Sequence, residues 1–288
     1  MNALHITGLT KSFSRFSLQN INLELPQGYI MGLVGKNGAG KTTLFKTIMN
    51  HLLKHSGEIK IYGLDNQTEE AQAKLQIAYI ADSPIDAGVN SLLTQKKSFA
   101  SVYSDWDEEK FQSLMEKFKL DQKTKIKNLS KGMKVKFSIA LALSHNARLI
   151  LLDEPTAGLD PVARREVMTL LQQELQDETK SILFSTHVTS DLDGIADYLT
   201  IIDQGQILMS ENREIISDKW RILKLVDLPA SVSSMDVVRG IIPTSFGYSV
   251  LTSDFDKLGG LLPEDTPTAI PNYEDIMIHM VKGDSKDV

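Results

Sequence analysis

Residues 35–42 read GKNGAGKT, a spacing of glycines, a lysine and a threonine that is typical of a loop binding nucleotide phosphates. The glycines let backbone N–H groups curl around an anion without Cβ clashes. We expect Lys41 to reach the β- and γ-phosphates, and Thr42 to offer its hydroxyl to Mg²⁺. The motif predicts a nucleotide site, but by itself it does not distinguish kinases, GTPases and ATPases.

A second group of residues that could take part in chemistry is the carboxylate pair Asp153 and Glu154. They end the apolar run LILLDE at residues 149–154. Adjacent carboxylates disfavour each other's ionisation unless a cation lies near. Mg²⁺ would supply that cation, with Asp153 holding it and Glu154 placed to polarise an attacking water. The alternative is a strand end followed by a polar turn.

Short, continuous apolar runs stand next to these residues in the sequence. Runs of this kind are typical of strands in a parallel sheet that is covered on both faces, so we expect such strands to position the motifs. The runs lie at residues 29–34, 77–81, 148–152, 181–185 and 199–203. A helical pattern follows Lys41, so the chain alternates strands and helices. This order predicts an α/β core.

Two further regions differ from this core. Residues 84–127 show almost no strand signal, and Asp107 is a plausible N-cap for an amphipathic helix, which predicts a helical insertion. After about residue 210, the pattern predicts strands at 221–226 and 246–252 and a helix at 273–281. We interpret this tail as a small α+β appendix.

The segment LSKGMK, residues 129–134, places Ser130 as the N-cap of an apolar helix. It is either a capped helix start alone or a second anion site, made of a hydroxyl and free backbone N–H groups.

The composition excludes some kinds of functional site and argues against some kinds of partner. The 288 residues include no cysteine, which excludes disulfides, thiolate zinc sites and a cysteine nucleophile. The net charge of -6 argues against a nucleic-acid partner. No apolar run is long enough to span a membrane, and no signal peptide is expected at the start.

Taken together, residues 3–210 resemble the ATP-binding subunit of an ABC transporter. GKNGAGKT resembles the Walker A motif, LSKGM the signature motif and LILLDE the Walker B motif with its catalytic glutamate. AGLD at 157–160 resembles the D-loop, and His187 in FSTH the switch histidine. The resemblance implies a P-loop NTPase (RecA-like) core over 1–210, with an N-terminal antiparallel β part, a helical subdomain at 84–147 and the appendix at 211–288.

The resemblance also implies roles for individual residues in an ATPase that uses ATP and Mg²⁺. Glu154 is the general base, and Lys41 and His187 act at the γ-phosphate. Asp82 replaces the family's usual glutamine, either as a Mg²⁺ ligand beside Thr42 and Asp153 or as a strand-end cap. The implied nucleotide-binding residues are Phe13, Asn37, Gly38, Ala39, Gly40, Lys41, Thr42, Thr43, Ser130, Gly132 and Asp160.

Phe13 stands where the family places the aromatic ring that stacks on adenine. The alternative is that Phe13 packs in the core, in which case Phe16 is the next choice.

Members of this family work as head-to-tail pairs. The single copy of each motif implies that this chain pairs with itself or with a paralogue. Ser130 and Gly132 would then reach the γ-phosphate held by the opposite subunit, and Asp160 would couple the two sites. A polytopic membrane permease would dock on the helical subdomain, which places the chain peripherally at the cytoplasmic face of the membrane.

Asp82 and the LSKGM variant resemble bacterial exporter ATPases whose membrane subunits are separate chains. Two alternatives remain open: the ATPase of an importer with a regulatory tail, and a soluble, non-transport ABC ATPase. The cargo is not encoded in motifs of this chain.

Overall fold

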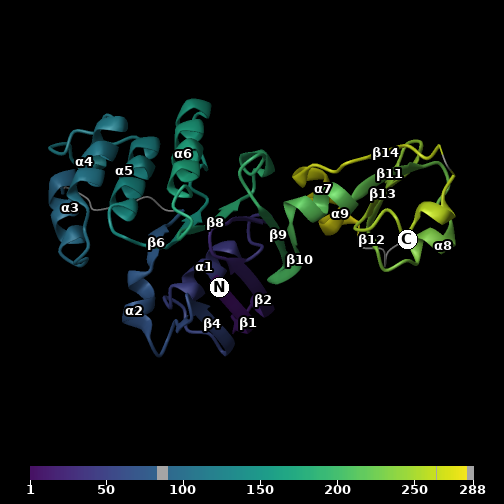
Figure 1. The fold of residues 1–288 in the computed structure, drawn as a ribbon, viewed down its shortest axis with the longest axis horizontal. Coiled ribbons are helices and arrows are strands. Elements are labelled where there is room, and N and C mark those ends of the chain that lie inside the picture. The colour runs from purple at the N-terminus through teal and green to yellow at the C-terminus, as the bar shows by residue number, and fades with distance from the viewer. Residues whose placement is uncertain (83–89, 264, 284–288) are drawn as a thin grey trace.

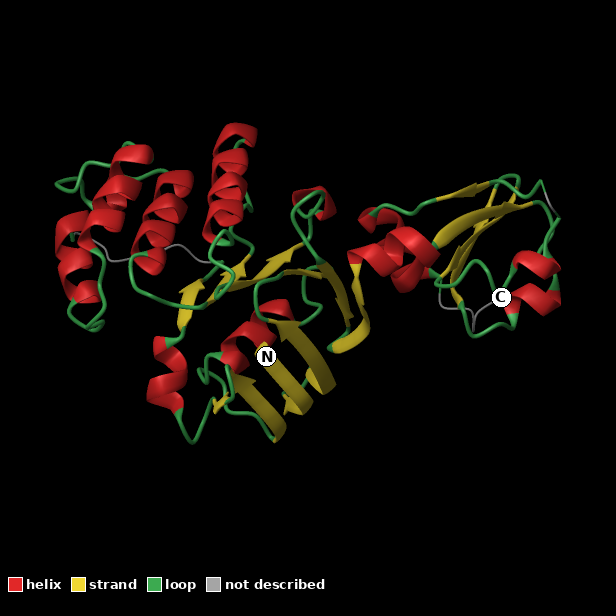
Figure 2. Cartoon of the chain, viewed as in Figure 1, coloured by secondary structure: helices red, strands yellow, loops and turns green. Residues whose placement is uncertain are grey.

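The computed structural model describes residues 1–82, 90–263 and 265–283. A central sheet lies between a group of helices on one side and a C-terminal unit on the other (Figure 1). Strands of the central and N-terminal sheets lie close together in the middle of the molecule, as Figure 2 shows. Among the described residues, we find no helix that combines the length and the apolar character needed to cross a membrane.

The central sheet has six strands in the order β10-β9-β3-β8-β7-β6. Adjacent strands of this sheet run parallel, except that β10 is antiparallel to β9. The strands are β3 (Ile30–Val34), β6 (Ile77–Ile80), β7 (Leu149–Asp153), β8 (Ser181–Thr186), β9 (Tyr198–Asp203) and β10 (Gln206–Asn212). Every residue of β3, β7 and β8 is buried, which confirms the prediction of a sheet covered on both faces.

An antiparallel sheet of order β2-β1-β4-β5 forms the N-terminal part. Its strands are β1 (Asn2–Ser12), β2 (Ser17–Pro26), β4 (Ser56–Ile61) and β5 (Leu64–Asp65). Helix α1 (Lys41–Ile48) leaves the phosphate-binding loop, and α2 (Glu70–Leu75) precedes β6. Together these elements confirm the predicted antiparallel β part beside an α/β core.

The predicted helical insertion lies between β6 and β7. It contains α3 (Leu92–Ala100), α4 (Glu108–Lys117), η1 (Ile126–Asn128) and α5 (Lys131–Leu143). Residues 84–89, where we placed its beginning, lie outside the described residues. The Asp107 side chain accepts a hydrogen bond from the Lys110 N–H at 2.8 Å, as expected for an N-cap. Helix α6 (Pro161–Glu174) follows β7.

The C-terminal unit follows β10, which pairs with β9 as far as Asn212. Its sheet has the order β12-β13-β11-β14. The elements are α7 (Arg213–Lys219), β11 (Arg221–Leu225), α8 (Ala230–Ser233), β12 (Val238–Thr244), β13 (Gly247–Thr252), η3 (Gly259–Leu261), β14 (Thr268–Ala269) and α9 (Tyr273–Lys282). Its own buried cluster includes Leu223, Ile241 and Val250, which supports the interpretation of an α+β unit.

His145, just after α5, is a buried histidine. Its ring stacks on Tyr103 with 4.0 Å between ring centroids, and within the described residues neither ring nitrogen has a hydrogen-bond partner. Burial lowers the pKa of His145 from 6.5 to about 4, although Asp105 acts in the opposite direction. Between these pH values the unfolded state binds more protons, so stability is lost as the pH falls from 6.5 through 4.

We therefore predict that His145→Phe, which keeps an aromatic stack and removes the titrating group, flattens this pH dependence. One pKa unit corresponds to about 1.4 kcal/mol, so the variant should remove about 3 kcal/mol of acid destabilisation. Urea unfolding at pH 7 and pH 4.5 measures the difference. Buried His279, whose pKa is also lowered mainly by burial, should leave a residual slope. An unchanged slope in the variant would contradict this assignment.

Candidate nucleotide-binding and hydrolysis site

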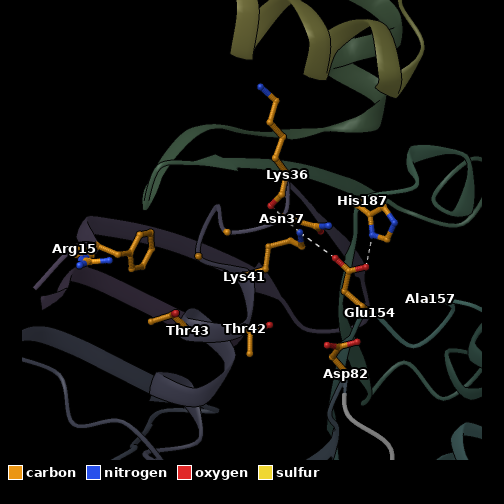
Figure 3. A pocket seen from close by; sticks show the side chains of 13 residues that line it. Arg15, Lys36, Asn37, Lys41, Thr42, Thr43, Asp82, Glu154, Ala157 and His187 are labelled. Atoms are coloured by element: carbon orange, nitrogen blue, oxygen red, sulfur yellow. Dashed lines mark hydrogen bonds and ion pairs between the residues drawn. The ribbon is translucent and has the colours of Figure 1, made fainter. Parts of the chain in front are cut away.

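A cavity of about 760 Å³ lies at the C-terminal ends of central strands (Figure 3). Such edges are the usual ligand sites of open α/β sheets. The cavity combines most of the predicted phosphate loop with residues that follow β6, β7 and β8. Its lining residues are Arg15, Phe16, Lys36, Asn37, Gly38, Gly40, Lys41, Thr42, Thr43, Asp82, Glu154, Ala157 and His187.

The loop between β3 and α1 has the geometry of an anion cradle. Gly38 and Gly40 adopt φ of 83° and 116°, a region that glycine enters at no steric cost. A Cβ on Gly35 would lie 2.4 Å from the Ile202 carbonyl oxygen, so only glycine fits there. The N-terminus of α1 has no side-chain cap, which leaves backbone N–H groups and the helix dipole available to phosphate.

Lys41 is buried at the base of this loop. Its Nζ donates hydrogen bonds to the carbonyl oxygens of Gly35 at 2.6 Å and Lys36 at 3.2 Å. The same Nζ forms an ion pair with Glu154 Oε1 at 3.0 Å. The lysine that we expect to bind phosphate is therefore paired with the carboxylate that we expect to act as base.

Glu154 is fixed from both backbone and side chain. It has a φ of 52°, uncommon for a residue with a side chain, and its N–H donates to Ser185 Oγ at 3.0 Å. The other carboxylate oxygen contacts Nδ1 of His187. Figure 3 shows Glu154 between Lys41 and His187, so the structure brings the three predicted catalytic residues together.

Asp153 provides a position suited to a cation. It is fully buried, its Oδ1 accepts a hydrogen bond from Ser185 Oγ at 2.8 Å, and Oδ2 has no partner among the described residues. Burial raises the pKa of Asp153, while the hydroxyls of Ser185 and Thr42 lower it. An orphaned buried oxygen beside a threonine hydroxyl fits a divalent cation that completes its shell with water and phosphate oxygens.

The signature residues Ser130 and Gly132 lie outside this cavity, beside the part of the D-loop that follows Ala157. Ser130 Oγ caps α5 by accepting from the Met133 N–H at 3.2 Å, and Asp160 Oδ1 caps α6. A Cβ on Gly132 would lie 3.5 Å from Leu159 Cδ2, so the two motifs are in contact. Ser130, Gly132 and Asp160 are absent from the cavity lining, and so is Asp153, which is buried.

The turn between β1 and β2 supplies the aromatic side of the site. Phe16 and Arg15 line the cavity, whereas Phe13 does not, and Phe13 is 44% exposed to solvent. This exposure rules out the core-packing alternative for Phe13. The Phe13 N–H donates to the Phe16 carbonyl at 2.7 Å, so both rings belong to one turn. Sequence reasoning missed Arg15, because no motif marks it.

Phe13→Ala tests whether this exposed ring binds adenine. Stacking of a base on an aromatic side chain is worth about 1–3 kcal/mol, so ATP affinity should fall roughly fivefold or more. The melting temperature should barely change, since little buried surface is lost. Phe246, 88% exposed in the C-terminal unit, is the matched control. Equal nucleotide affinities for the two alanine variants would remove Phe13 from the site.

The parallel sheet, the glycine loop that leads into α1, and the carboxylates at the strand ends define a P-loop ATPase. Residues 18–157 match the ABC transporter family model. The chain is 30% identical to the bacitracin transport ATP-binding protein BcrA of Enterococcus faecalis, over 96% of this chain and 95% of that protein. It belongs to the ABC transporter family, as an ATP-binding subunit that hydrolyses ATP.

Other relatives agree with this assignment. The chain is 30% identical to the lantibiotic transport ATP-binding protein SrtF of Streptococcus pyogenes, over 72% of this chain and 90% of that protein. It is also similar to a solved ATP-binding subunit of an ABC transporter, with a TM-score of 0.68 and 25% identity over 75% of this chain and 92% of that one.

Proposed function

We propose that this chain is the motor subunit of a bacterial ABC export complex and drives a separate membrane permease by ATP hydrolysis. The observation that carries the proposal is the cavity that joins the phosphate loop, Glu154 and His187. The relatives named for bacitracin and lantibiotic transport support the transport role.

Within the cavity, each side chain has a distinct task. Backbone N–H groups of the loop bind the phosphates, and Lys41 exchanges Glu154 for the γ-phosphate. Glu154, once released, accepts the proton of the attacking water, while His187 orients the γ-phosphate. The chain's ligands for Mg²⁺ are the Thr42 hydroxyl and the carboxylates of Asp153 and Asp82. Bound Mg²⁺ supplies neutralisation of the charge that develops on the phosphates.

The site of one copy is open where a second copy would complete it. Ser130 lies outside the chain's own cavity, at a helix N-terminus with no acidic residue in its first turn. A positively polarised helix end of this kind favours a phosphate. In a head-to-tail pair, Ser130 and Gly132 of each copy would bind the γ-phosphate held by the other.

The permease docks on the helical subdomain in this proposal. The turn between α3 and α4 offers an exposed position there, Val102, which is 69% exposed. We would place a photo-crosslinking residue at Val102, and a second at Phe246 as a control on the C-terminal unit, in the native host. The proposal predicts that the chain sediments with membranes and that Val102, but not Phe246, crosslinks to one polytopic protein.

The rival functions predict other outcomes. A chain that stays in the soluble fraction and crosslinks to ribosomes or DNA proteins would overturn the transport role. Crosslinking to a permease that takes up cargo would favour the importer alternative.

A further inference from the structure

A second, smaller cavity adjoins the nucleotide site and includes a residue of the C-terminal unit. It measures about 220 Å³ and is lined by Gly35, Lys36, Asn37, His187 and Met277. Four of these belong to the phosphate loop and the switch histidine, and Met277 belongs to α9. Figure 3 shows Lys36 extending from the site toward the helical ribbon of the C-terminal unit. Helix α9 therefore borders a cavity that His187 and the phosphate loop also line.

Helix α9 packs against the segment that follows His187. Ile276 is fully buried, and Tyr273 Oη donates to the Ala196 carbonyl at 3.4 Å. Both side chains join a core cluster that includes Leu192 and Ala196. These buried contacts hold the backbone of α9 at a fixed position relative to the segment that follows His187.

Leu192 in turn connects this segment to the strand before the phosphate loop. A Cβ on Gly32 of β3 would lie 2.4 Å from Leu192 Cδ1, so these elements are in close contact. Close-packed contacts transmit a displacement of one element to the next. The packing thus links α9, the η2 segment (Thr189–Asp191) and β3 as one unit.

His187 itself has freedom to move only in some directions. Its Nδ1 contacts Glu154, and its side chain is 44% exposed. Away from Glu154, the ring borders the small cavity that Met277 closes from the side of α9. When Glu154 is released from His187, the half-buried thioether side chain limits how far the ring can turn into that space.

We infer that Met277 is a positioning residue for His187, and that the C-terminal unit thereby sets the rate of ATP hydrolysis. This inference rests on the proposed role of His187 at the γ-phosphate. Small displacements of a reacting group are costly, so loss of the Met277 side chain should lower kcat roughly three- to tenfold. Nucleotide affinity should stay within about twofold, because the phosphate cradle is built from backbone groups.

The test compares Met277→Ala, Met277→Leu and Met280→Ala in the full chain. Met280 lies one turn further along α9 and packs on the same core cluster, but it does not line the cavity. We expect Met277→Ala to lower kcat, Met277→Leu to restore it, and Met280→Ala to lower the melting temperature alone. Fluorescent ATP titration and thermal unfolding on the same samples separate affinity and stability from turnover.

A double-mutant cycle with His187→Ala makes the coupling explicit. If Met277 acts through His187, Met277→Ala has no further effect in the His187→Ala background. Independent, multiplicative effects on kcat, or equal effects of Met277→Ala and Met280→Ala, would overturn the inference. Turnover that survives His187→Ala unchanged would instead remove the proposed role of His187, and the inference with it.

Discussion

Glu154→Gln should lower ATP turnover by at least roughly 100-fold, because a general base contributes about 10²–10⁴ to a rate. The amide has nearly the shape of the carboxylate but does not accept a proton from water. Steady-state phosphate release, measured with saturating ATP and Mg²⁺, gives the comparison.

The same variant should bind ATP at least as tightly as the native chain. In the structure, Glu154 Oε1 pairs with Lys41 Nζ at 3.0 Å, so the carboxylate competes with phosphate for the lysine. A neutral amide competes less, and the variant should accumulate as an ATP-bound dimer visible by light scattering.

Glu174→Gln is the matched control for this prediction. Glu174 is similarly buried and ion-paired, with Lys110 at 2.8 Å and Lys180 at 2.7 Å, but it lies outside the cavity. Its replacement should reduce stability and leave turnover per folded molecule unchanged. Hydrolysis that persists in Glu154→Gln would exclude Glu154 as the base.

Lys41→Ala should weaken ATP binding roughly 10- to 100-fold, since a hydrogen bond to a charged group is worth about 1.5–3 kcal/mol. The buried ammonium is held by two carbonyls of its own loop, which places it beneath the expected phosphates. Its loss also removes the ion pair of Glu154, whose side chain still contacts His187.

Lys46→Ala provides the control, because Lys46 lies on the same helix α1 but is exposed to solvent. We expect its ATP affinity to match that of the native chain, as calorimetric titration would measure. Unchanged affinity in Lys41→Ala would contradict the assignment of the phosphate cradle.

Five strands of the central sheet, β3, β6, β7, β8 and β9, were predictable because they are short and mainly apolar runs. Strand β12 was missed, because Gly240 and Pro243 interrupt its pattern and its pairing with β13 comes from tertiary structure.

The chemistry of the site was predictable to the extent that motifs encode it. Lys41, Glu154 and His187 were each identified from local patterns, but their mutual contacts join residues far apart in the chain. Arg15 and Met277 have no local signal at all, because their place at the site depends on how a hairpin turn and the last helix pack.

In the proposed dimer, two copies complete each site, with Ser130 of one copy facing the ATP of the other. Mixing two inactive variants tests it directly. Lys41→Ala disables the phosphate loop, and Ser130→Tyr blocks the signature helix end. In a mixed dimer, one site combines both defects and the other has neither.

We predict that the equimolar mixture regains turnover. Random pairing makes half of the dimers mixed, each with one of two sites intact, so the rate should reach roughly a quarter of the native value. Turnover that stays at the level of the separate variants at every mixing ratio would contradict a site shared between two copies.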